Sequence, residues 1–359
     1  MAEIGVTIGI FTTELGEGFE RAFSSVEAQT YDNCAVVVVS PENPGIAGTE
    51  WIEATPGEPI GSRYDKFREL ATGDYFLLLD EYASIDPETV AKSVVFLEDH
   101  PDCVAVYGPT LYESPGESES CLPVAVQAGE PEKRVELLFR HLTHIGPWYG
   151  LRRRITAEIP LRTSLGTELY YLACLAWYGS IGAIGDIQCR VMTAPGFNVS
   201  RADVTRLGCP AYQSEDPTLS AIALLFCGLG IVDERFSALS MLERLRLATL
   251  ASEALRARSD ILDDILLIPY CSRLFDNFNV TKAFRDIRCN IARMILSNEI
   301  TFQNKNIVDI VNFLCFYRIE NLPPDQGDAG IIDRMDRILS DQPTNEESNR
   351  VTLVSAMYY

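Results

Sequence analysis

The chain has 359 residues, of which 51 are acidic and 30 are basic, so its formal net charge is −21. This balance argues against nucleic acid as a main partner, because phosphate contacts require Lys and Arg. A hydrophobic content of 47% excludes a largely disordered chain. Residues 1–130 hold 24 acidic and 5 basic side chains, whereas residues 131–359 hold 27 and 25. This asymmetry indicates two modules, and the acidic excess is either solvated surface or a cluster of metal-binding carboxylates.

Short β-rich runs alternate with helical stretches through residues 4–110. The alternation predicts an α/β unit with a mostly parallel sheet, with strands near residues 6–11, 35–39, 51–54, 75–79 and 104–108. Ligands of such sheets bind where the strands end at their carboxyl side. We therefore expect one crevice, lined by the residues that end three of these strands: Phe11, Thr12 and Thr13; Ser40 and Pro41; Asp80 and Glu81.

The remaining chain changes character twice. Residues 110–135 are rich in Glu, Ser, Pro and Gly and predict a polar loop, after which a helix is expected over 167–178 and a strand region over 179–187. From residue 218 onward, apolar residues recur at helical spacing. We expect a first domain over 1–215, with halves at 1–110 and 111–215, a helical module over 216–320, and a loosely packed tail over 321–359 with a short helix near Ile331.

Cysteine and histidine usage constrains the compartment and the kind of metal site. None of the ten cysteines forms a C-x-x-C pair, and most lie in apolar runs, which indicates reduced, buried thiols. Three histidines argue against a zinc site built on His and Cys. The longest apolar run, residues 219–232, is shorter than the roughly 20 residues that a bilayer span needs, and no secretory signal is evident. We expect a cytoplasmic protein without a transmembrane span.

Several pieces of the first 110 residues resemble, in order and spacing, the nucleotide-binding half of family 2 glycosyltransferases. Residues 6–40 resemble the family's first strand, its helix with an S-V-x-x-Q-T-Y ending, and its second strand. Residues 71–75 (Ala-Thr-Gly-Asp-Tyr) resemble the segment before the third strand, and residues 77–80 (Leu-Leu-Leu-Asp) the strand that ends in the metal motif. Pro87 stands where the family starts its next helix, and residues 96–108 match the usual continuation.

The resemblance implies a GT-A-type, Rossmann-like mixed sheet flanked by helices and followed by a C-terminal helical module. It implies transfer of a sugar, with inversion, from a nucleotide-diphosphate sugar to a hydroxyl of a glycan or other acceptor, in glycan or polysaccharide assembly. A divalent cation, Mn²⁺ or Mg²⁺, would be held by Asp80, which would otherwise bind the donor ribose or cap a turn. The implied donor-binding residues are Phe11, Thr12, Thr13, Ser40, Asp65, Asp80, Glu81 and Arg190.

Two departures from the family pattern leave alternatives open. The second acid of the usual Asp-x-Asp motif is Tyr82, which cannot replace a carboxylate ligand, and Ser40 and Pro41 stand where acids usually bind the base. One alternative is a catalytically inactive, glycosyltransferase-like binding or interaction protein. The other is a metal-independent transferase in which arginines compensate the diphosphate charge, with Arg190 and Arg201 as candidates in a covering loop.

The second half supplies the implied base and acceptor residues. Glu168 aligns with the family's catalytic carboxylate, eleven residues before Gly179, although an acid in a first helical turn is also favoured by the helix dipole. Trp148, Tyr149 and Arg152 resemble part of the acceptor side, and the two aromatics either stack on a sugar or belong to the core. The arginines near residues 244–258 are either a solvated helix face or a peripheral membrane contact.

Overall fold

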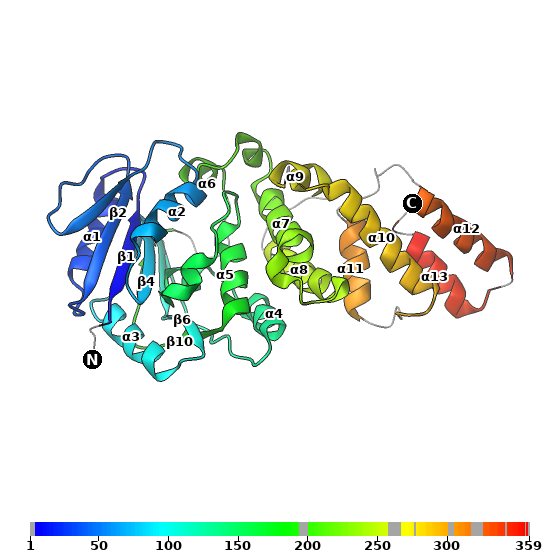
Figure 1. Ribbon diagram of the computed structural model, residues 1–359, viewed down its shortest axis with the longest axis horizontal. Coiled ribbons are helices and arrows are strands. Elements are labelled where there is room, and N and C mark those ends of the chain that lie inside the picture. Colours follow the sequence, from blue (N-terminus) through cyan, green and yellow to red (C-terminus); the bar gives the residue numbers. More distant parts are fainter. Residues whose placement is uncertain are drawn as a thin grey trace. The chain divides into compact units, whose positions relative to one another are not determined.

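The computed structural model describes residues 4–193, 200–257, 267–275, 278–300, 305–316, 326–341, 343–355 and 357. Contacts divide the chain into two compact units, Met1–Pro217 and Thr218–Tyr359. Figure 1 shows that the first unit is a sheet flanked by helices and that the second is helical.

The first unit follows the predicted alternation of strands and helices. Its strands are β1 (Val6–Phe11), β2 (Cys34–Ser40), β3 (Thr49–Glu53), β4 (Tyr75–Asp80), β5 (Ala83–Ile85), β6 (Cys103–Tyr107), β7 (Thr110–Ser114), β8 (Glu117–Cys121), β9 (Leu151–Arg153), β10 (Ser180–Ala183) and β11 (Cys189–Val191). Its helices are α1 (Glu17–Glu27), α2 (Ile60–Leu70), α3 (Thr89–Asp99), α4 (Pro131–His141), α5 (Thr167–Tyr178) and α6 (Arg201–Arg206), with 3₁₀ turns η1 (Gly146–Tyr149), η2 (Arg154–Glu158) and η3 (Ala211–Ser214).

Within the described residues, the main sheet has the order β10-β6-β9-β4-β1-β2-β3, and β9 runs antiparallel to both of its neighbours. The other pairs are parallel. Strand β4 is a nearly continuous apolar run buried on both faces, as a central parallel strand requires. The predicted fold class, a mixed sheet flanked by helices and followed by a helical module, is confirmed.

The register of the central strands creates the predicted edge. Phe11, the last residue of β1, pairs with Asp80, the last residue of β4, and also with Val39 of β2. The residues that follow these strands therefore emerge side by side. Helices pack against several of these strands: α1 lies against β1 and β5, and α5 lies against β6 and β10 (Figure 1).

The expected polar loop after residue 110 contains a hairpin instead, formed by β7 and β8. Thr110 and Tyr112 of β7 are buried, whereas β8 is almost wholly exposed, so the hairpin has one solvated strand and no apolar signal. Its turn contains Gly116 at φ +87°, a left-handed conformation that favours glycine. The hairpin joins a second sheet because β7 pairs with β11, a strand almost eighty residues away in the sequence.

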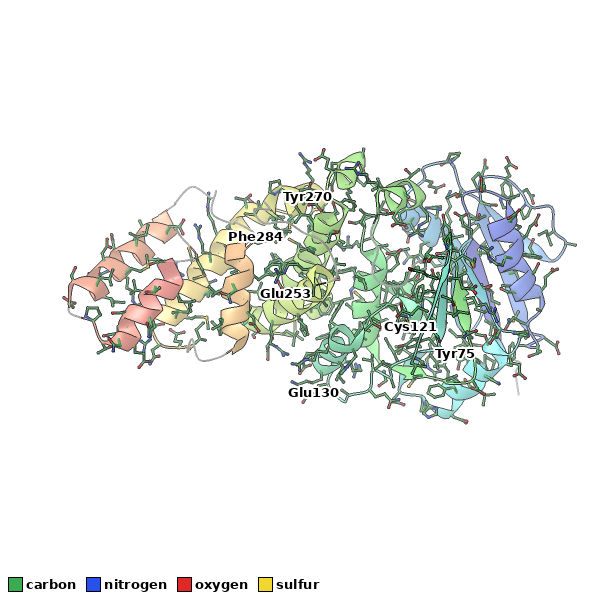
Figure 2. All side chains as sticks on the ribbon, turned by 180° about the vertical axis from the view of Figure 1, so that it is seen from behind. Tyr75, Cys121, Glu130, Glu253, Tyr270 and Phe284 are labelled. Carbon is green, nitrogen blue, oxygen red and sulfur yellow. The ribbon has the colours of Figure 1, made fainter. Side chains whose placement is uncertain are left out.

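The second unit is helical over its described residues, and its core is aromatic in part. The ring of Phe226 lies 4.5 Å from that of Phe313 and 5.7 Å from that of Phe284, which Figure 2 labels on the helical unit. Its elements are α7 (Pro217–Cys227), the π-helical turn η4 (Gly228–Val232), the 3₁₀ turn η5 (Glu234–Phe236), α8 (Met241–Arg256), α9 (Leu267–Leu274), α10 (Val280–Leu296), α11 (Lys305–Phe316), α12 (Gln326–Ser340) and α13 (Asn345–Ser355).

The expected loose tail holds two helices that pack on α10, namely α12 and α13. Ile331 and Met335, one helical turn apart, are buried, as are Val351 and Val354, so each helix has an apolar contact face despite its polar composition. The helical spacing that the sequence shows from residue 218 onward includes residues 258–266, which lie outside the described residues. In the described part of the chain, every helix is too short or too polar to cross a bilayer.

Candidate active site

The carboxyl ends of β1 and β4 are joined through the carboxylate of Glu81. Its Oε2 accepts hydrogen bonds from the Thr12 hydroxyl at 2.5 Å and from the Thr13 backbone N–H at 2.7 Å. Its Oε1 accepts a bond from the Thr13 hydroxyl at 2.9 Å. Both carboxylate oxygens of Glu81 therefore accept hydrogen bonds from the segment that follows β1, and these bonds link the ends of the two strands.

Asp80 is held differently, although it is the adjacent residue. The Tyr149 hydroxyl donates to its Oδ2 at 3.1 Å, and the Tyr82 backbone N–H donates to its Oδ1 at 3.0 Å. The Asp80 side chain is 15% exposed. Burial raises the pKa of Asp80, and the charge of Arg206 and these two hydrogen bonds only partly offset that rise.

Glu168 begins the second half of the site, in the first turn of α5. The helix follows Gly166, whose φ of +80° turns the chain into the helix in a conformation that favours glycine. The Glu168 side chain is 13% exposed. Burial raises the pKa of Glu168, and the nearby charge of Arg206 lowers it in part. The predicted base is thus a largely desolvated carboxylate whose proton affinity is increased.

Arg206 stands between the two predicted carboxylates. Its Nη2 lies 3.4 Å from Glu168 Oε1, its Nη1 lies 3.8 Å from Asp80 Oδ2, and its Nε donates to Asp203 Oδ1 at 3.0 Å. Burial by itself would lower the pKa of Arg206, but the carboxylates of Glu168, Asp80 and Asp203 raise it strongly. One guanidinium therefore links acidic groups from β4, α5 and α6.

The backbone around Arg206 is anchored on two sides. Ser200 and Asp203 form a capping box at the start of α6, so the helix that carries Arg206 has a defined beginning. At its other end, the Arg63 guanidinium donates to the Arg206 carbonyl, and the Ile60 N–H donates to the Leu207 carbonyl at 2.8 Å. These bonds to α2 fix the position from which the Arg206 side chain extends.

A small cavity of about 30 Å³ lies at this junction. Asp80, Glu168 and Arg206 all line it, with Trp148 and apolar residues of β1, β4 and α2 completing the wall. The two carboxylates that the sequence predicted separately, 88 positions apart, therefore lie on one cavity.

Several predicted site residues lie outside this junction. The Ser40 hydroxyl is buried and donates to the Glu42 carbonyl, and Asp65 is exposed on α2 with Arg68 as its ion-pair partner. Arg190 is exposed on β11. Arg152 is fully buried, with its guanidinium over the rings of Trp148, Tyr171 and Phe76, so the geometry does not support a contact between Arg152 and an acceptor.

The aromatics of η1 have distinct positions. Trp148 lines the cavity and its ring meets that of Tyr171 edge to face, with centroids 5.5 Å apart. Tyr149 is buried and is directed at Asp80 through its hydroxyl. Its link to Asp80 was not anticipated, because nothing in the local sequence connects residues 69 positions apart.

Arg206 was also missed by the sequence analysis, which named Arg190 and Arg201 instead. A local signal was present: Ser200 and Asp203 have the spacing of a capping box, which predicts a short helix ending in Arg206. Arg201 is exposed at the other end of that helix. The capping-box spacing predicts the helix, but only the fold shows which of its two arginines points to the carboxylates.

The residues present do not fit a protein-held divalent cation. Such ions take several oxygen ligands, yet Glu81 has both oxygens bonded to the β1 end and Tyr82 has no carboxylate. Asp80 remains as one carboxylate, and a guanidinium lies 3.8 Å from it. Among the residues that the structure describes, no group of three His, Cys, Asp or Glu side chains has the arrangement of a metal site.

No protein-family model matches the chain, and no curated protein matches it. Solved structures with similar folds include S. aureus TarS 1-349, with a TM-score of 0.48 and 12% identity over 98% of this chain and 91% of that chain. The same protein in complex with UDP-GlcNAc gives a TM-score of 0.45 and 13% identity over the same shares. Mannosyltransferase PcManGT from Pyrobaculum calidifontis, in complex with GDP-Man and Mn²⁺, gives 0.42 and 15% over 77% and 80%. At these identities and TM-scores, the similarity indicates nothing about the function of this chain.

Proposed function

We propose that this protein is a glycosyltransferase of hexosyltransferase type, which moves a sugar from a nucleotide-diphosphate sugar to an acceptor hydroxyl with inversion. The observation that carries the proposal is the meeting of Asp80 and Glu168 on one cavity beside a guanidinium. The resemblance assigns these two carboxylates to the donor and to the base, respectively. Their convergence from two separate parts of the chain is what a single reaction centre requires.

Glu168 is the general base of the proposed reaction. Its ionised carboxylate takes the proton from the acceptor hydroxyl, and the oxygen of that hydroxyl attacks the anomeric carbon from the face opposite the diphosphate. The bond between the anomeric carbon and the diphosphate oxygen breaks, and its electron pair leaves with the nucleoside diphosphate. The raised pKa of Glu168 strengthens it as a proton acceptor once it is ionised.

Asp80 orients the donor in this proposal, by accepting a hydrogen bond from a ribose or sugar hydroxyl. The bonds from Tyr149 and Tyr82 hold its carboxylate in one rotamer, which lowers the entropy cost of binding. Phe11 and the Thr12–Thr13 segment lie at the same strand end. Trp148, on the cavity wall, is the proposed contact for the acceptor sugar.

The wider setting of the reaction belongs to the same proposal. We propose an acceptor that is a glycan or another hydroxyl compound in polysaccharide assembly, and a cytoplasmic location. The majority of the cysteines whose side chains the structure describes are buried, which suits a reducing compartment. A peripheral membrane contact through the arginines of α8 has less support, since Arg256 pairs with Glu253 and Arg244 donates to the Asp233 carbonyl.

The test is a panel of UDP- and GDP-sugars, assayed for release of the nucleoside diphosphate with and without acceptor glycans. Glu168→Gln removes the base without changing the side-chain volume, and we expect it to lower kcat by about 10²- to 10⁴-fold. Glu158→Gln, at an exposed glutamate of η2, is the matched control and should retain wild-type turnover. Unchanged turnover in Glu168→Gln would refute the assignment of the base.

A catalytically inactive nucleotide-sugar-binding protein is the second candidate. It is favoured by the ion pair that holds Glu168 against Arg206 and by Tyr82 in place of an acid. Such a protein would be stabilised against heat by a nucleotide sugar, because a ligand that binds only the folded state raises its stability. It would release no nucleoside diphosphate with any acceptor, and Glu168→Gln would leave that thermal shift intact.

A further inference from the structure

The leaving group of the proposed reaction needs a positive charge close to it. A nucleoside diphosphate gains negative charge as the anomeric C–O bond breaks, and a fixed cation aimed at that charge lowers the barrier. A divalent ion often supplies this charge, but the carboxylates of this site do not fit such an ion. Glu81 is hydrogen-bonded to the segment that follows β1, and Asp80 already faces a guanidinium.

Arg206 has the position and the free hydrogen-bonding capacity for this task. Its Nε and Nη2 are directed to Asp203 and Glu168. Its Nη1 lies 3.8 Å from Asp80 Oδ2, which is beyond hydrogen-bonding distance, so the two N–H groups of Nη1 are available to phosphate oxygens. The side chain is 24% exposed and lines the cavity, so a ligand can reach it.

A second arginine supports the same charge from behind. Arg63 is buried, its Nη2 donates to the Arg206 carbonyl, and its Nε has no hydrogen-bond partner. Burial and the charge of Arg206 lower the pKa of Arg63, while Glu58 and Glu81 raise it in part. The Nε of Arg63 is buried and Arg63 does not line the cavity, so it adds positive charge next to Arg206 without a ligand contact of its own.

We propose that Arg206, with Arg63 behind it, supplies the positive charge that holds the donor diphosphate in place of a divalent cation. This inference rests on the proposed function, because it assumes a nucleotide-diphosphate donor. A planar guanidinium forms two parallel hydrogen bonds with phosphate oxygens, so Arg206 provides orientation as well as charge. Binding of the diphosphate would also draw Arg206 from Glu168 and release the base for the acceptor proton.

The experiment measures the binding of UDP and GDP by calorimetry, to the full chain in EDTA and in Mn²⁺ or Mg²⁺. We expect at least one nucleotide to bind with nearly the same Kd in both conditions. Arg206→Gln should weaken that binding by about 10- to 100-fold in EDTA, the loss expected for charge-assisted hydrogen bonds. Arg206→Lys, which keeps the charge and loses the fork, should lose less than Arg206→Gln.

Two controls separate this effect from a disturbed fold. Arg140→Gln changes an exposed helical arginine that pairs with Glu136, and should leave the Kd unchanged. The corresponding nucleoside monophosphate should lose far less affinity than the diphosphate in Arg206→Gln, which a general disruption of the site would not produce. If Arg206→Gln does not fold, Arg206→Lys and the EDTA comparison decide the question.

The outcomes distinguish the inference from the proposal beneath it. Nucleotide binding that requires Mn²⁺ or Mg²⁺, or that survives Arg206→Gln in EDTA, overturns the role of Arg206 and leaves the glycosyltransferase proposal standing. Failure of both nucleotides to bind with or without metal overturns the nucleotide-sugar donor itself, and the inference with it.

Discussion

The two units of this chain each contain a shielded arginine beside acidic groups, and the two arginines are held in opposite ways. In the helical unit, Arg288 is 5% exposed and pairs with the fully buried Asp328 at 2.8 Å. In the first unit, Arg206 is more exposed, has three carboxylates around it at 3.0 to 3.8 Å, and lines a cavity. The buried Arg288–Asp328 pair joins α10 to α12, whereas Arg206 is partly exposed and has N–H groups that a ligand can use.

These two arginines differ as a charge that stabilises the fold differs from a charge that is placed to bind a ligand. In a closed pair, each charge depends on the other because water cannot replace a missing partner. In the open cluster, the carboxylates outnumber the cation, and burial raises the pKa of two of them. The burial of Asp80 and Glu168 therefore costs free energy, which is typical of ionisable residues in a catalytic site.

The largest expected effect is on the closed pair. Asp328→Asn removes the buried carboxylate that pairs with Arg288 at 2.8 Å, and we expect the free energy of unfolding in urea to fall by about 3 kcal/mol. Asp333→Asn, at an exposed position of the same helix, should change it by less than about 0.5 kcal/mol. Equal losses of unfolding free energy in the two variants would show that the Arg288–Asp328 pair does not stabilise the fold specifically.

The second prediction concerns the pH dependence of the open cluster. Only ionised Glu168 accepts a proton, so kcat/KM should fall as pH decreases through its pKa, which burial raises and Arg206 lowers in part. Arg206→Gln removes the lowering influence, and the acidic limb of the profile should move to higher pH. Profiles of kcat/KM against pH for wild type, Arg206→Gln and Arg140→Gln test this, and coincident limbs would disprove the coupling.

A smaller effect is expected from the hydroxyl that orients Asp80. Tyr149→Phe removes one hydrogen bond at 3.1 Å and keeps the ring, so we expect a loss of about 3- to 10-fold in kcat/KM for the nucleotide sugar. Tyr178→Phe, at an exposed tyrosine at the end of α5, serves as the control. A wild-type value in Tyr149→Phe would show that Asp80 needs no orienting partner.

The smallest expected effect is that of Glu168→Gln on the stability of the fold. Glu168→Gln should change the free energy of unfolding by less than about 1 kcal/mol, since a carboxylate whose pKa is raised on folding gives the native state no net electrostatic stabilisation at neutral pH. Denaturation in urea, beside Asp328→Asn, provides the measurement. A loss as large as that of Asp328→Asn would mean that Glu168 is a structural residue.

Strong local patterns made the first unit predictable. The buried apolar runs that form β1, β2 and β4 specify parallel strands because both of their faces meet other layers. The hairpin of β7 and β8 escaped prediction because β8 is solvated and is held only by pairing with its neighbour. The sequence predicts a short helix near Ile331, where the longer α12 lies, but α13 escaped prediction because its few apolar residues gain a partner only when α10 is present.

Local periodicity and a motif in the sequence specify the central strands, the strand ends where a ligand would lie, and the candidacy of Asp80 and Glu168. The fold alone shows that Glu81 links the ends of β1 and β4, that the Tyr149 hydroxyl donates to Asp80, and that Arg206 lies between the two carboxylates. The physical reason is that charges and hydrogen bonds act through space at a few ångströms. Their partners come from β4, η1, α5 and α6, which the chain separates widely and the packing of the sheet brings together.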